Sequence, residues 1–372
     1  MKTLRYFVLA LLIVLPIKGY AVNPESYERH LLRAIDLLIS LDHENATTQL
    51  ESLTKNYPYS RSGYLLHADI LAARGGLTSA IGERMRHLRR DAVSELRQQL
   101  RLRWHYWNTI RPSRDDLYPA PLLKLGNNGR RVLYMDIPSA RLIVYENDRG
   151  KIKELGNFYA SIGISGFEKR REGDQKTPIG VYRITGFIPG RKLHERYGPG
   201  ALPIDYPNDL DQIYERTGSG IWLHGTEPGS VNRAPRASDG CLSLANRDFL
   251  SLLRLIGDSS ITSVVIDSTP EWIGLAELHN RREALSKTIQ LWLTTWLASS
   301  ASPLTKDLQL VESQLFAYPG ENRLYVAYLT LSNGQQMLHS MRQYWRYTIG
   351  NEWQIVAEFS NSLDPPRITN NL

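Results

Sequence analysis

Cysteine is nearly absent from this sequence, and the motifs of metal sites are missing. Of the 372 residues only Cys241 is a cysteine, so the chain cannot form an internal disulfide. The nine histidines are scattered, without a His-Glu-x-x-His motif or a cysteine pair, so we predict no metal site and no cofactor. No basic and aromatic motif indicates nucleic acid as a partner. A lone thiol is left with three uses, namely packing, pairing with another chain, or reactivity.

Long apolar runs are also missing, except at the N-terminus. Lys2 and Arg5 precede an apolar stretch over residues 6–17, and Gly19-Tyr20-Ala21 is a small-x-small cleavage site. We interpret residues 1–21 as a secretory signal peptide, since the alternative, an uncleaved membrane anchor, needs a longer apolar stretch. The basic formal net charge of +7 suits an anionic envelope surface. A thiol kept alone in an oxidising compartment is a liability unless it is used, which favours reactivity.

The stretch from Ile221 to Asn246 carries the candidate chemistry. The apolar run Ile221-Trp222-Leu223 predicts a buried strand that ends at His224, and Gly240-Cys241 follows after a polar loop. A histidine and a cysteine at the ends of neighbouring elements suit a base and its nucleophile, and the imidazole is expected to favour the thiolate. The backbone N–H groups of Gly240 and Cys241 are candidates for an oxyanion hole. The alternatives are a cysteine that packs as a small apolar residue and a histidine that is a satisfied polar group.

Three segments in this part of the chain fit one family pattern. His-Gly-Thr at 224–226 is followed by a loop and by Ser-Asp-Gly-Cys at 238–241. Upstream, residues 172–182 contain Gly-x-x-x-Thr-Pro-x-Gly-x-Tyr, and residues 200–208 read Gly-Ala-Leu-Pro-Ile-Asp-Tyr-Pro-Asn. Together they resemble the L,D-transpeptidase catalytic domain, also called YkuD-like, and the third segment is similar to its longer, Gram-negative members. The resemblance spans residues 131–268 in the order of the family.

The resemblance implies a periplasmic cysteine acyltransferase that acts on peptidoglycan stem peptides. The Cys241 thiolate attacks the carbonyl of the L-to-D bond before the terminal D-alanine, while His224 accepts the thiol proton and later protonates the leaving amine. Many relatives have His where this chain has Asp239, and Arg where it has Ser243. The chain is similar to a sub-branch with Ser-x-Gly-Cys, two further residues and Leu-x-Asn. These departures leave the catalytic pair intact and the acceptor open.

Other site residues are assigned from their positions in the loop. Ser238 and Asp239 are expected to orient the imidazole or the loop, although a backbone carbonyl is an alternative third group. Gly225 and Thr226, which follow the histidine, are expected to line the substrate site. Arg236 is close enough in sequence to bind an acidic substrate group, and an ordinary surface role is its alternative.

The N-terminal part, residues 22–120, is predicted to be helical and resembles a single tetratricopeptide-like unit. Apolar residues repeat at helical spacing in three segments, around residues 31–38, 50–53 and 62–73. A fourth helix is predicted over residues 78–106. Its many arginines are interpreted as a solvated face, with binding to anionic lipid or glycan as the alternative. Residues 112–121 contain prolines and are interpreted as a linker.

The whole chain is predicted to be a multidomain α+β protein. The catalytic domain is expected to be mostly β, with strands over residues 132–137, 141–145, 157–162, 180–185 and 263–266. Asn246 is expected to cap a helix that follows the cysteine. Residues 284–363 resemble a small α+β module of the NTF2-like type, with a helix over residues 288–297 and four strands. Its aromatic residues, such as Tyr344, Trp345 and Tyr347, are expected to pack in the core rather than to line a pocket.

The sequence leaves three functions open. The first is an L,D-transpeptidase whose acceptor is an amine of another stem peptide or of an envelope protein. The second is a hydrolase of the same fold, and the third is an inactive wall-binding scaffold. The charged loop Phe167–Gln175 favours transfer by covering the site, whereas the loss of a cation at Ser243 favours water as acceptor. Residues 131–268 alone are expected to form the acyl-enzyme, and the oligomeric state is not predicted.

Overall fold

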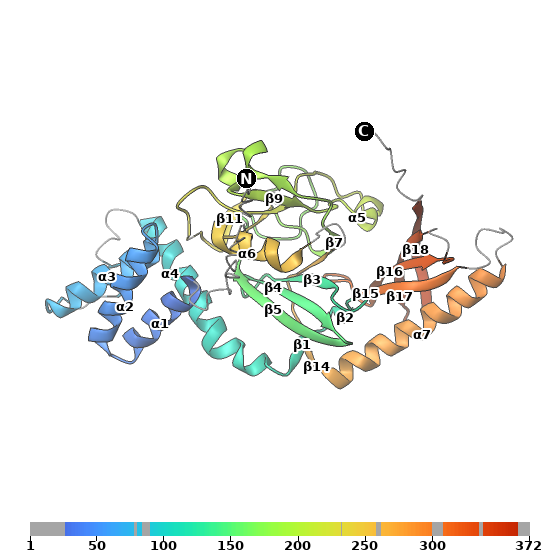
Figure 1. Cartoon of the computed structure of the whole chain (residues 1–372), viewed down its shortest axis with the longest axis horizontal. Coiled ribbons are helices and arrows are strands. Elements are labelled where there is room, and N and C mark those ends of the chain that lie inside the picture. Colours follow the sequence, from blue (N-terminus) through green and yellow to red (C-terminus); the bar gives the residue numbers. More distant parts are fainter. Residues whose placement is uncertain are drawn as a thin grey trace, which may run out of the picture.

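The computed structural model describes residues 27–77, 80–83, 90–231, 233–257, 262–299, 308–334 and 338–363. The signal peptide predicted for residues 1–21 lies outside these ranges. A helical region, a central β-rich domain and a C-terminal sheet with a long helix follow one another along the molecule (Figure 1). This arrangement confirms the predicted α+β class with a mostly-β centre. Of the helices in the described ranges, none has the length and apolar character needed to cross a membrane.

An apolar core holds the helical region together. Its helices are α1 (Tyr27–Ile39), α2 (His43–Asn56), α3 (Arg61–Arg74) and α4 (Arg90–His105). The side chains of Asp42 and Ser60 begin α2 and α3 by accepting hydrogen bonds from backbone N–H groups of the first turn. Leu31, Leu50 and Leu53 are fully buried between the helices. The helical spacing of apolar residues therefore predicts this region correctly.

The arginine-rich helix differs from its prediction at both its start and its surface. Residues 80–83 form a turn, in which the carboxylate of Asp69 accepts a hydrogen bond from the N–H of Gly82. Residues 84–89 of the predicted helix lie outside the described ranges. Within α4, the side chain of Arg103 is only 3% exposed. The arginines are therefore not all part of a solvated face, because at least this one is buried against the central domain.

The predicted linker takes part in the sheets on either side of it. A π-helical turn (Tyr106–Ile110) precedes the predicted linker of residues 112–121, which contains a 3-10 turn (Pro112–Arg114) and β1 (Leu117–Pro119), and β2 (Leu122–Lys124) follows it directly. β1 pairs with β14 (Trp272–Gly274) at the end of the central domain. β2 pairs with β15 of the C-terminal sheet. The segment thus connects all three parts of the molecule by hydrogen bonds.

Two main sheets build the central domain. The larger has the order β5-β4-β3-β13-β7 and consists of β5 (Lys151–Tyr159), β4 (Arg141–Asp148), β3 (Arg131–Asp136), β13 (Ser263–Asp267) and β7 (Gly180–Arg183). The smaller has the order β12-β10-β9-β8 and consists of β12 (Leu242–Ser243), β10 (Trp222–His224), β9 (Gly200–Pro203) and β8 (Ile188–Pro189). Two further short strands, β6 (Ile162–Gly163) and β11 (Arg236–Ser238), pair in parallel. The strand predicted over residues 157–162 is therefore the end of β5 followed by a break before β6.

Both faces of the larger sheet are buried, which explains its nearly continuous apolar strands. On one face Leu133 and Val264 pack with Phe249 of α6 (Asn246–Ile256). On the other face Tyr134 and Val265 pack with residues of the C-terminal sheet. The central domain and the C-terminal sheet therefore share one apolar core.

The C-terminal part is a helix laid against a five-stranded sheet (Figure 1). The helix α7 (Leu275–Ser299) is much longer than the predicted 288–297 segment. The sheet has the order β18-β17-β16-β15-β2, with β15 (Gln309–Ala317), β16 (Leu324–Ser332), β17 (Leu338–Tyr347) and β18 (Trp353–Leu363). Tyr344 and Trp345 are buried in its core, which confirms the packing role predicted for them.

Candidate active site

Strand pairing brings Cys241 and His224 to one face of the smaller sheet. β10 and β12 run in parallel with Leu223 opposite Leu242 and His224 opposite Ser243. Side chains alternate along a strand, so Cys241, two residues before Ser243, points to the same side as His224. Cys241 immediately precedes β12, so it lies beside the strand pair that carries His224. The sequence prediction that these two residues meet at the ends of neighbouring elements is consistent with this register.

The imidazole of His224 is fixed by a backbone carbonyl. Its Nδ1 lies 2.5 Å from the carbonyl oxygen of Gly225. A carbonyl can only accept, so Nδ1 carries the hydrogen and Nε2 is left as the basic nitrogen. The ring of Tyr197 meets the imidazole edge-on at 5.0 Å between centroids. Of the three candidates for the orienting group, the structure therefore places the carbonyl next to the ring.

Burial keeps both members of the pair neutral. His224 is 4% exposed and Cys241 is 8% exposed. Burial lowers the pKa of His224 to about 4 and raises the pKa of Cys241 to about 11. The Sγ of Cys241 donates to the carbonyl oxygen of Gly220 at 3.4 Å. The expected thiolate is therefore not the resting form, because desolvation of the thiol outweighs the backbone hydrogen bond from Trp222 and the charges of Arg196 and Arg233, which lower its pKa.

The turn before the nucleophile is built from Ser238 and Gly240. The hydroxyl of Ser238 donates to the carbonyl of Cys241 at 2.6 Å and accepts from the N–H of Gly240 at 3.2 Å. The Gly240 N–H is thus already used within the turn, whereas no hydrogen bond in the described ranges uses the N–H of Cys241. Gly240 has φ +121°, and a Cβ there would lie 2.6 Å from the carbonyl oxygen of Lys176. Only glycine fits this close approach.

Thr177, from the upstream Thr-Pro motif, supports the same turn. Its hydroxyl donates to the carbonyl of Gly240 at 2.9 Å. The hydroxyl oxygen of Thr177 also accepts from the N–H of Gly163 at 2.9 Å. Thr177 is completely buried. The Thr-Pro motif therefore acts on the site through the backbone that positions the cysteine.

Asp239 and Arg236 lie on the outer side of this turn. Asp239 is exposed, and its carboxylate lies 3.4 Å from the amide nitrogen of Gln175 and 3.9 Å from the guanidinium of Arg196. It has no hydrogen bond to His224 within the described ranges. Arg236 is also exposed, and its guanidinium lies over Gly166. Neither position orients the imidazole, so the predicted role of Asp239 is limited to the loop.

The residues after His224 are held by α6. Asn246 is the first residue of α6 rather than its cap, because Ala245 occupies the cap position. Its side-chain oxygen accepts from the N–H of Thr226 at 2.6 Å. The hydroxyl of Thr226 donates to the carbonyl of Ser230 at 2.9 Å, and a Cβ on Gly225 would lie 2.4 Å from Asn246. Thr226 thus shapes the loop. Gly225 allows the side chain of Asn246 to come close, and its carbonyl contacts the imidazole of His224.

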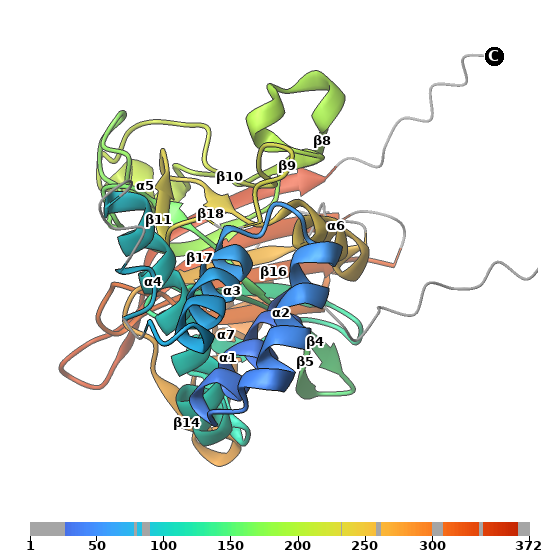
Figure 2. The same ribbon diagram turned by 90° about the vertical axis from the view of Figure 1, so that its left-hand side faces the viewer.

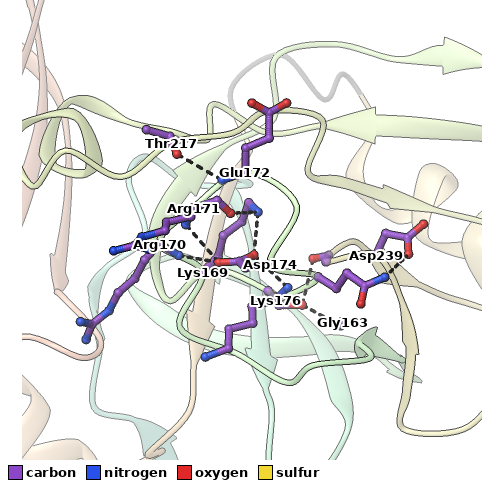
Figure 3. Close-up of polar contacts among 12 residues, drawn as sticks. Gly163, Lys169, Arg170, Arg171, Glu172, Asp174, Lys176, Thr217 and Asp239 are labelled. Carbon is purple, nitrogen blue, oxygen red and sulfur yellow. Dashed lines mark hydrogen bonds and ion pairs between the residues drawn. The ribbon is translucent and has the colours of Figure 1, made fainter.

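The charged loop near the site is closed on itself around one carboxylate. Figure 3 shows Lys169, Arg170 and Arg171 gathered around Asp174. Asp174 accepts from the ammonium of Lys169 at 2.8 Å and from the N–H groups of Arg170 and Lys176 at 2.8 and 3.1 Å. Burial opposes its charge, yet these hydrogen bonds lower the pKa of Asp174 to about 2. The loop is therefore a fixed wall of the site rather than a loose cover.

The central domain also matches a known family. Residues 130–266 match the model of the L,D-transpeptidase catalytic domain, YkuD. Bd1075 from Bdellovibrio bacteriovorus has a similar structure, with a TM-score of 0.54, 21% identity, and coverage of 67% of this chain and 100% of that one. The helical cell shape determining protein Pgp2 from Campylobacter jejuni has a TM-score of 0.51, 19% identity, and coverage of 64% and 95%. At these identities the likeness shows the fold, and no curated protein matches the sequence significantly.

Sequence reasoning missed several residues around the candidate site. Tyr197 contacts the imidazole of His224 from a segment that is far in sequence from both candidate catalytic residues. Arg233 lies in the loop between His224 and Cys241, and its guanidinium contacts Ser243. Asn246 was noticed in the sequence because it follows the cysteine closely, but its position there suggested a helix cap rather than a contact with Thr226. A lone tyrosine or arginine in a loop has no pattern that places it, because its position depends on how the loop folds back.

Proposed function

We propose that the protein is a periplasmic cysteine L,D-transpeptidase that acts on peptidoglycan tetrapeptide stems. The observation that carries the proposal is the placement of Cys241 and His224 on one face of adjacent strands, with Nδ1 of His224 held by a carbonyl. The match of residues 130–266 to the L,D-transpeptidase catalytic domain supports it. So does the supported turn at Gly240, which brings backbone and thiol close to a substrate carbonyl.

In the proposed reaction the thiol turns from Gly220 toward the imidazole as the substrate enters. Nε2 of His224 takes the thiol proton while Sγ forms a bond to the carbonyl carbon of the L-to-D amide. The N–H of Cys241 stabilises the oxyanion. The C–N bond then breaks, and the imidazolium gives its proton to the leaving amine of the terminal D-alanine. An amine of a second stem peptide, or of an envelope protein, attacks the resulting thioester and releases the thiol.

Hydrolysis of the thioester is the second candidate. The loop around Asp174 is closed by its own hydrogen bonds, Cys241 is only 8% exposed, and water needs less space than a second stem peptide to reach the thioester. This observation weakens the argument that the charged loop opens to admit an acceptor. It does not change the acylation step, which transfer and hydrolysis share.

Incubation of the purified protein with a disaccharide-tetrapeptide tests the proposal. We expect an intact-mass increase equal to the acyl group on the wild type and no increase on Cys241→Ala, which removes the nucleophile without removing much packing volume. Dimers, or exchange of the terminal D-alanine for another D-amino acid, indicate transfer, and release of the terminal residue alone indicates hydrolysis. Turnover by Cys241→Ala would disprove both candidates.

A further inference from the structure

Arg233 brings a positive charge to the side of the catalytic pair. Its Nη1 donates to the hydroxyl of Ser243 at 3.4 Å, and its Nη2 donates to the carbonyl of Ala237 at 2.8 Å. Ser243 is directly opposite His224 in the strand pair, and it lies two residues after Cys241. The guanidinium is therefore placed beside the face of the sheet from which the thiol and imidazole project.

The guanidinium has no anionic partner. It is partly buried, and both of its polar contacts are to uncharged groups. No carboxylate in the part of the chain that the structure describes forms an ion pair with it. By contrast, the partly buried guanidinium groups of Arg130 and Arg342 bind Glu312 and Asp205. A partly desolvated guanidinium without a carboxylate is a binding site for an anion.

The backbone around Arg233 is held firmly. Its carbonyl accepts from the side-chain amide of Gln99 at 3.2 Å and from the hydroxyl of Tyr159 at 2.9 Å. The next carbonyl, that of Ala234, accepts from the hydroxyl of Ser161 at 2.6 Å. Gln99 belongs to α4 of the helical region and is 1% exposed. Both the helical region and the central domain thus fix the position of this arginine.

The spacing suits the end of a peptide. Two residues of extended chain cover about 6.6 Å, the spacing between the backbones of Cys241 and Ser243. The Arg233 guanidinium lies beside Ser243 and is close enough for its charge to act on both the thiol and the imidazole. In an extended substrate, the carboxylate of the residue after the scissile bond lies about 3.5 Å from the carbonyl that the thiol attacks. A guanidinium beside Ser243 can reach that carboxylate while the carbonyl lies over Cys241.

We propose that Arg233 binds the free α-carboxylate of the residue that leaves the stem peptide. The site then selects peptides that end one residue after the scissile bond. The inference rests on the proposed function, and it adds a residue that decides which peptide is accepted. Ser243 contributes by being small, because a larger side chain there would occupy the space that the guanidinium fills.

A pair of substrates tests the role directly. The disaccharide-tetrapeptide with a free C-terminal carboxylate is compared with the same compound carrying a C-terminal carboxamide, using kcat/KM for release of the terminal residue. We expect the wild type to prefer the acid by about tenfold or more, mainly through KM. Arg233→Gln should lose this preference, and Arg233→Lys should keep part of it. Arg149→Gln, at a side chain that is 85% exposed, is the control and should behave as the wild type.

A second measurement does not depend on turnover. Alkylation of Cys241 by anionic iodoacetate and by neutral iodoacetamide is compared at one pH in the wild type and each variant. The ratio of the two rates should fall severalfold in Arg233→Gln and stay unchanged in Arg149→Gln. If the wild type cleaves neither peptide, the proposed function fails, and this ratio still decides whether Arg233 attracts an anion to the thiol. The inference would be overturned if Arg233→Gln kept both the preference for the acid over the carboxamide and the wild-type ratio of iodoacetate to iodoacetamide rates.

Discussion

The central domain contacts its two neighbours in different ways. On the C-terminal side, Tyr134 and Val265 share an apolar core with Phe316 and Tyr344 of the adjoining sheet. On the N-terminal side the contact is polar, as the carboxylate of Glu28 binds the guanidinium groups of two arginines. An apolar core holds two parts together without specifying fine geometry, whereas hydrogen bonds and ion pairs fix positions. The site lies on the polar side.

The polar contact consists of a buried charge cluster and several single hydrogen bonds. Glu28 of α1 pairs with Arg103 of α4 and, at 2.6 Å, with Arg141 of β4, whose side chain is fully buried. The guanidinium of Arg103 lies 3.9 Å from the centre of the Tyr159 ring. Near α6, Arg247 donates to the hydroxyl of Tyr57 at 3.1 Å. In Figures 1 and 2, α6 accordingly lies beside the helical region.

This comparison changes the expectation for the isolated domain. Residues 131–268 contain both candidate catalytic residues, but one face of their larger sheet is covered by the C-terminal sheet. Removing that sheet would expose Tyr134, Ile143 and Val265 to water. Removing the helical region would take away Glu28, with which Arg141 forms an ion pair. The boundaries at residues 131 and 268 therefore remain a prediction, and the packed unit includes residues of the two neighbouring parts.

The largest effect is expected from Phe316→Ala in the apolar interface. Phe316 is fully buried, so the substitution should lower the free energy of unfolding by about 3–5 kcal/mol. Chemical denaturation measures this loss. Below the unfolding transition, kcat should be unchanged because the substitution is on the side away from the smaller sheet. A loss of kcat in the folded variant would show that the two sides are not independent.

Glu28→Gln should have a slightly smaller effect on stability and a larger one on the site. The substitution removes the carboxylate that pairs with two buried guanidinium groups and leaves only the more distant charge of Asp248 near them, which costs about 3 kcal/mol. Because α1 and α4 would loosen, the support of Arg233 through Gln99 should weaken, and the acid-over-amide preference should fall. Glu51→Gln, at an exposed position of α2, is the matched control. Full stability in Glu28→Gln would mean that the charge cluster does not hold the interface.

The buried thiol should respond to pH in a defined direction. Because its pKa is raised to about 11, alkylation by iodoacetamide should accelerate about tenfold per pH unit up to that value. The folded chain also keeps a proton that the unfolded chain loses above its ordinary thiol pKa of 9.0, so stability should decline between about pH 9 and 11. Cys241→Ala should remove that part of the decline. An alkylation rate that levels off below pH 8.5 would show a thiolate at rest.

The smallest change is expected from Gln99→Leu. One hydrogen bond to the carbonyl of Arg233 is lost, while Tyr159 still donates to it, so stability should fall by about 1 kcal/mol. The acid-over-amide preference should nevertheless drop measurably, since the loop would be held from one side only. Asn56→Leu on α2, which is exposed, serves as the control. Equal preferences in the two variants would assign the position of Arg233 to the central domain alone.

The sequence by itself determined the class of the fold, the order of its parts and the identity of the two candidate catalytic residues. Helical spacing in the N-terminal region and apolar runs in the central strands are local patterns, and local patterns survive without tertiary information. A single cysteine and the His-Gly-Thr and Ser-x-Gly-Cys motifs are equally local. The exact limits of α7 and β5 were not predicted, since α7 begins at Leu275 and β5 begins at Lys151, directly after the turn from β4.

Only the tertiary structure decided how the site is held and charged. The carbonyl of Gly225, rather than Ser238 or Asp239, contacts the imidazole because the chain turns back immediately after β10. The neutral thiol results from burial, which no sequence motif reports. Arg233 lies beside Ser243 because α4 and β5 hold its backbone from two sides. The contacts that hold Arg233 join residues far apart in the chain, so they exist only once the helical region and the central domain have come together.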